Sequence, residues 1–213
     1  MRSVRPMPGN PWPHDMTMMV EDRPSSLLEL LWLREAHGLD VQGELLPPLL
    51  VETPTPAEHP VDGEVRAEWA AAWPQLWEAV LAHAGTEGDP DLFEKLRLTA
   101  DGSPERAALL AEAMGPSAVD VFGPDVFGDP SYRVWERNGI ERHMATRREV
   151  LENSPERRDL EALIPAWRAG LTKVVTIPCR GDHTRRVGDN AVLVTDETRA
   201  DSERYRRALA AFA

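Results

Sequence analysis

The chain has 213 residues, 36 of them acidic and 24 basic, and a net charge of −12. This balance argues against a protein that binds nucleic acid over a broad surface, because phosphate contacts require net positive charge. The sequence contains no run of the ~20 apolar residues that a membrane span requires, and no apolar run follows the early arginines as in a secretory signal. We therefore expect a cytoplasmic protein without a membrane partner. Its one cysteine, Cys179, allows no intramolecular disulfide and fits a reducing compartment.

The charge is unevenly distributed along the chain. Residues 1–130 carry a net charge of −15, whereas residues 131–213 carry +3. Such asymmetry permits an anion-binding site in the C-terminal part, and attraction between the two halves of the chain is the alternative explanation.

Three regions are predicted from the composition. Residues 1–23 are rich in Pro and Met and are expected to form a disordered N-terminal arm. Residues 24–60 are expected to form a helix that ends near Gly38, followed by a stiff linker, since residues 53–60 contain three prolines. Residues 61–213 are then the main domain.

Most of this main domain has helical patterns. Trp69, Trp73 and Trp77 recur at intervals of four residues, which predicts one stripe on a helix over residues 63–84 and favours core packing over an aromatic ligand cage. The tetrapeptide Ser-Pro-Glu-Arg occurs at residues 103–106 and 154–157, where Ser and Pro are typical of helix N-termini. A long helix is predicted between Asp129 and about residue 153.

The C-terminal part contains the segments with a strand pattern. Residues 173–177 and 191–195 are rich in β-branched side chains, and residues 184–187 lie between two turn sequences, Arg180-Gly181-Asp182 and Gly188-Asp189-Asn190. We therefore predict an α+β fold, mainly helical, with a small antiparallel three-stranded sheet near the C-terminus.

The turn region 179–190 gathers the polar residues that are most suggestive of function. They are Cys179, Arg180, Asp182, His183, Arg185 and Arg186. Arginine forks match carboxylates and phosphates, so this segment is predicted to bind an acidic protein or an anionic small molecule. The protein would then be a binding or interaction protein with an accessory or regulatory role. Pairing of these arginines with acidic residues of the same chain is the structural alternative.

Two other functions use the same segment. An enzyme acting on an anionic small molecule would employ Cys179 as a nucleophile activated by His183, although an unpaired cysteine is also a common buried apolar residue. A local nucleic-acid site would employ the arginines and would weaken steeply with salt. The six histidines form no HExxH motif and the single cysteine no Cys pair, so neither a metal nor a cofactor is predicted.

Overall fold

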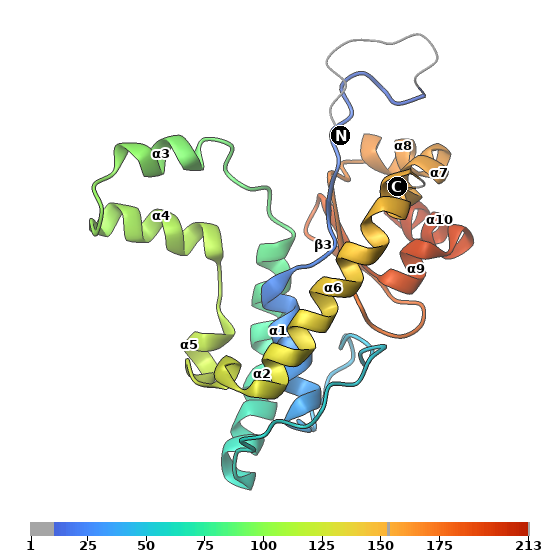
Figure 1. Ribbon diagram of the computed structural model, residues 1–213. Coiled ribbons are helices and arrows are strands. Elements are labelled where there is room, and N and C mark those ends of the chain that lie inside the picture. The colour runs from blue at the N-terminus through green and yellow to red at the C-terminus, as the bar shows by residue number, and fades with distance from the viewer. Residues whose placement is uncertain (1–10, 153, 213) are drawn as a thin grey trace.

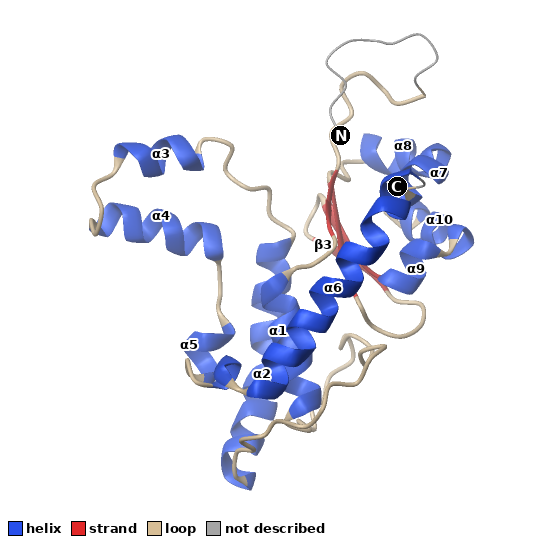
Figure 2. Cartoon of the chain, viewed as in Figure 1, coloured by secondary structure: helices blue, strands red, loops and turns tan. Residues whose placement is uncertain are grey.

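The computed structural model describes residues 11–152 and 154–212, and for residues 146–152 it describes the backbone alone. At its centre lies a four-stranded mixed sheet with the order β1-β2-β4-β3 (Figures 1 and 2). The strands are β1 (Met19–Glu21), β2 (Lys173–Ile177), β3 (Thr184–Val187) and β4 (Ala191–Thr195). The first two pairs, β1 with β2 and β2 with β4, are parallel, and β3 pairs antiparallel with β4.

The predicted α+β class is confirmed, but the predicted antiparallel three-stranded sheet is wrong. β4 pairs directly with β2 in parallel, so β3 lies at the sheet edge instead of between them. All residues of β2 and β4 are buried, whereas β3 has exposed residues. Strands covered on both faces are typical of parallel pairing, because the helices that connect parallel strands pack on both sides.

Helices make up most of the described chain outside the sheet. They are α1 (Ser25–Ala36), α2 (Gly63–Ala84), α3 (Leu92–Leu98), α4 (Pro104–Met114), α5 (Ala118–Phe122), α6 (Pro130–Glu152), α7 (Pro155–Arg158), α8 (Leu160–Arg168), α9 (Asp196–Ala200) and α10 (Ser202–Ala210), with a short 3₁₀ turn at Val126–Gly128. The Ser side chains at 103 and 154 accept hydrogen bonds from backbone N–H groups three residues later, which confirms the predicted helix starts.

Helices cover both faces of the sheet. On one face, α1 and α2 pack in a cluster that includes Val175 and Leu193, and on the other face α8 and α10 pack with Val174 and Val192. The predicted core packing of the tryptophan stripe is confirmed for its last two members. Trp73 and Trp77 are fully buried, with their rings stacked 5.2 Å apart. The hairpin of α3 and α4 instead projects from this body (Figure 1), and none of its described helical residues is buried.

The N-terminal segment requires a correction. The prediction of a disordered arm over residues 1–23 is wrong for residues 16–21, because Met16 and Met18 are buried and β1 pairs with β2. Residues 1–10 of the predicted arm lie outside the described residues. Further along, the backbone of Leu50 forms a bridge with Cys179, and Leu27 of α1 shares a hydrophobic cluster with Leu193 of the sheet. Residues on both sides of the predicted boundary at residue 60 therefore contribute to a common core.

Candidate functional site

The predicted site in the turn region 179–190 is held by contacts within the chain. Arg180 donates from Nε to the carbonyl oxygen of Leu50 at 2.8 Å and from Nη2 to the hydroxyl of Thr53 at 3.0 Å. This guanidinium thus fastens the segment after α1 to the end of β2. The contact is structural, because it satisfies backbone and hydroxyl groups of the loop.

The two strand arginines contact different segments on opposite sides of the sheet. Arg185 makes a two-pronged ion pair with Glu78 of α2. Arg186 lies over the ring of Phe212, with its guanidinium carbon 4.3 Å from the ring centroid. Successive strand residues face opposite ways, so the two guanidinium groups do not form a common site.

Asp182 and His183 are also tied to the C-terminal helices. The Asp182 carboxylate accepts from the Thr198 hydroxyl at 3.0 Å and from Arg207 at 3.2 Å. The His183 ring has a buried Nε2 without a hydrogen-bond partner among the described residues. Burial, and secondarily the charge of Arg185, lowers the pKa of this imidazole, while Asp182 opposes the change. The ring is therefore neutral at physiological pH.

Cys179 lies in the core. Its side chain is fully buried, and this burial raises the pKa of the thiol to about 12. Because the thiolate is the reactive form of cysteine, the thiol is a poor nucleophile in this position. The geometry therefore agrees with the reading of Cys179 as a buried apolar residue and gives no support to the enzyme alternative.

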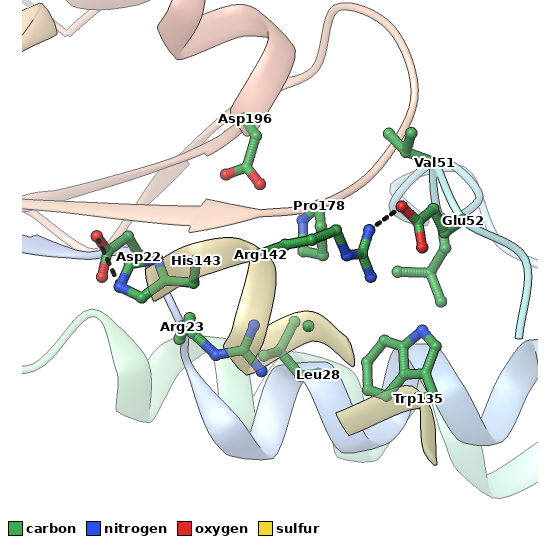
Figure 3. A pocket seen from close by; sticks show the side chains of 12 residues that line it. Asp22, Arg23, Leu28, Val51, Glu52, Trp135, Arg142, His143, Pro178 and Asp196 are labelled. Carbon is green, nitrogen blue, oxygen red and sulfur yellow. Dashed lines mark ion pairs between the residues drawn. The ribbon is translucent and has the colours of Figure 1, made fainter. Parts of the chain in front are cut away.

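A different group of residues lines a cavity of about 200 Å³ at the carboxyl ends of the three parallel strands. Asp22 follows β1, Pro178 follows β2, and Asp196 follows β4, while α6 and the segment after Leu50 close the remaining sides (Figure 3). The acidic and basic residues of the lining are Asp22, Arg23, Glu52, Arg142, His143 and Asp196. In open parallel sheets, ligands bind in crevices at this edge, so the cavity is the best-placed candidate site.

Two pairs of these side chains contact one another, as the dashed lines in Figure 3 show. Arg142 forms an ion pair with Glu52, and His143 Nε2 lies 3.8 Å from the Asp22 carboxylate. Arg23 is half-buried, and no hydrogen bond or ion pair joins its guanidinium to any residue that the structure describes. The guanidinium lies instead against the backbone of Gly139 on α6, where a Cβ atom would stand 3.0 Å from one of its terminal nitrogens.

Asp196 is the other charged group of the cavity without an ion pair to a described residue. The residue as a whole is exposed to solvent, but protein surrounds its carboxyl group on most sides. This burial raises the pKa of the carboxyl. The Thr176 hydroxyl and the charge of Arg199 oppose the rise, although the Thr176 hydroxyl makes no well-formed hydrogen bond within the described chain. Among the described residues, Arg23 and Asp196 are thus the cation and the carboxyl of the lining that form no ion pair.

The sequence interpretation did not identify this cavity, because its lining comes from separate elements. Asp22 and Arg23 lie in a segment that was expected to be disordered. Arg142 and His143 belong to a helix whose mixed charges are typical of a solvent-exposed surface. The available signal was the run of β-branched and apolar residues at 174–177 and 191–194, which is typical of central parallel strands whose ends form binding sites.

Comparisons with known proteins add no assignment. No protein-family model, curated protein or solved structure matches the chain. Within residues 11–152 and 154–212, no three His, Cys, Asp or Glu side chains are grouped to hold a metal ion. Over the same residues, no helix has the length and apolar character to cross a membrane.

Proposed function

We propose that this protein binds a small anionic molecule, a carboxylate or phosphate, in the cavity at the carboxyl ends of β1, β2 and β4, with Arg23 as the anchor. The supporting observation is the half-buried guanidinium of Arg23, which has no polar partner among the described residues. A guanidinium has five N–H donors, and no nitrogen of Arg23 is among the buried polar atoms of the described residues that lack a partner, so the group is open to an approaching ligand. A carboxylate or phosphate supplies acceptors that match the guanidinium fork.

The proposed ligand is anionic, as expected from the sequence, but its proposed site is the cavity instead of residues 179–190. Arg185 and Arg186 of the predicted site are already engaged by Glu78 and Phe212. A cavity of about 200 Å³ takes a molecule of a few heavy atoms, which favours a small ligand over an acidic protein surface or a nucleic-acid backbone. A small-molecule binding protein with an accessory or regulatory role is the function that this geometry favours.

Titration calorimetry with short carboxylates and inorganic phosphate tests the proposal. We expect saturable binding by the wild type, and a loss of about tenfold or more in affinity for Arg23→Gln, because a hydrogen bond to a charged group contributes roughly 1.5–3 kcal/mol. The matched control is Arg137→Gln, which removes an exposed arginine from α6. Residue 137 is two positions from both Trp135 and Gly139, so its side chain faces away from the cavity lining.

A second variant separates ligand binding from stability. Gly139→Ala places a methyl group against the Arg23 guanidinium and displaces it by a few tenths of an ångström. Alanine is also the better helix former, by about 0.8–1.0 kcal/mol in a helix interior. Weaker anion binding without a fall in melting temperature supports the proposal. The absence of saturable binding by any of these anions, or equal affinities of wild type and Arg23→Gln, refutes it.

A further inference from the structure

We propose that the ligand of this cavity is a small zwitterion, an amino acid with a short carbon chain, whose acidic group meets Arg23 and whose ammonium group meets Asp196. This inference rests on the proposed function and specifies its ligand. The motivating observation is that two charged groups of opposite sign in the lining, Arg23 and Asp196, have no ion pair to a described residue, whereas Arg142 pairs with Glu52 and His143 lies 3.8 Å from Asp22.

The two unpaired groups come from different sides of the cavity. Asp196 is the first residue after β4, so its carboxyl lies at the end of the sheet, while Arg23 lies two residues before α1. Figure 3 shows Asp196 on the sheet side of the cavity and the Arg23 guanidinium beside Leu28 of α1. A ligand between them must therefore present separate groups to the two sides, an acid to the guanidinium and a donor to the carboxyl.

Charge balance favours a zwitterion over a simple anion. Three carboxyl groups line the cavity, on Asp22, Glu52 and Asp196, against two guanidinium groups. A simple anion bound at Arg23 adds a negative charge to this set and leaves the Asp196 carboxyl without a partner. A zwitterion adds no net charge, and its ammonium group favours the ionised form of Asp196, whose pKa is raised by burial in the free protein.

The remaining lining suits a short carbon chain. Leu28, Val51 and Trp135 contribute apolar surface between the polar groups. A cavity of about 200 Å³ accommodates a few methylene groups between an acid and an amine, and not a peptide or a nucleotide. Burial of these methylene groups adds affinity without altering the polar match.

Calorimetry with matched ligands tests this inference. The probes are alanine, β-alanine and 4-aminobutanoate, each compared with the carboxylic acid that lacks the amine, propanoate or butanoate. For the wild type we expect at least one amino acid to bind tenfold or more tightly than its matched acid. In Asp196→Asn the amino acid should fall to the affinity of its acid, while the acid itself binds equally or more tightly. Asp189→Asn, an exposed change in the turn between β3 and β4, is the control and should leave both affinities unchanged.

The outcomes distinguish this inference from the proposed function. If the acids bind through Arg23 and the amino acids bind no tighter, the zwitterion inference is overturned while anion binding stands. If neither acids nor amino acids bind the folded wild type, both fail. The comparison of acid with amino acid in the wild type stays decisive even if Asp196→Asn is poorly folded, which circular dichroism detects.

Discussion

The carboxylate of Asp129 provides a direct test of the packing around α6. Its side chain is 5% exposed, and it accepts backbone N–H hydrogen bonds from Ser131 at 2.8 Å and from His59 at 3.0 Å. Burial alone would raise the pKa of this carboxyl, but the hydrogen bonds favour the charged form and lower the pKa from 3.8 to about 2. A carboxyl whose pKa is lower in the folded than in the unfolded state stabilises the protein at pH values above its unfolded-state pKa. This stabilisation is lost as the pH falls through the folded-state pKa.

The size of the effect follows from this difference. A fall in pKa from 3.8 to about 2 corresponds to roughly 2.4 kcal/mol at pH 7, of which about 1.3 kcal/mol remains at pH 3. Asp129→Asn replaces one acceptor oxygen by a donor that faces an N–H group. We therefore expect urea unfolding of Asp129→Asn at pH 7 to give a free energy of unfolding about 2 kcal/mol below that of the wild type. At pH 3 the difference in free energy of unfolding between the two proteins should be smaller by about 1 kcal/mol.

The control for this experiment is Asp62→Asn. Asp62 is an exposed N-cap of α2 that accepts from the N–H of Val65 at 2.9 Å, and asparagine caps helices as well as aspartate does. This variant should stay within about 0.5 kcal/mol of the wild type at both pH values. A constant difference between Asp129→Asn and the wild type across the pH range, or a loss below about 0.5 kcal/mol at pH 7, would refute the reasoning.

Three further measurements test burial elsewhere in the fold. Glu156→Gln breaks a two-pronged ion pair whose carboxylate side chain is 7% exposed, so urea unfolding should show a loss of about 3–5 kcal/mol, whereas the exposed pair removed by Glu94→Gln should give no measurable change. An aromatic disulfide reagent followed by absorbance should leave Cys179 unmodified in the folded protein near neutral pH and modify it in urea, and rapid native reaction would contradict the burial of the thiol. Met16→Ala should cost about 2–5 kcal/mol in the same unfolding assay, and Met19→Ala, at a 56% exposed position, under about 0.5 kcal/mol, whereas equal effects would contradict the ordered packing before β1.

The sequence predicts the longer helices and three of the strands, because these depend on local patterns. The β-branched runs identified β2 and β4, and the turn residues placed β3 between them in the chain. Local patterns do not determine which strands are neighbours, so the pairing of β2 with β4 was missed. β1 was also missed because its three residues follow a proline-rich stretch and receive their hydrogen bonds from β2, a partner more than 150 residues away.

The candidate site was less predictable than the fold. Nearness in sequence suggested that Arg185 and Arg186 belong to one site, yet strand alternation sends them to different partners, Glu78 and Phe212. The cavity instead unites Arg23 with Asp196, two residues separated by most of the chain. Only the tertiary arrangement brings such residues together, so composition and motif spacing give no direct indication of the site.

The strand order explains both the cavity and the engagement of the predicted arginines. In the predicted meander, β3 would separate the ends of β2 and β4 by two strand spacings, roughly 10 Å. In the structure Ile177 pairs with Thr195, so the following residues, Pro178 and Asp196, lie about one spacing apart and flank the same cavity. The same order moves β3 to the sheet edge, where Arg185 meets Glu78 of α2. A change at Asp196 should therefore alter ligand binding without disturbing the arginine contacts of β3.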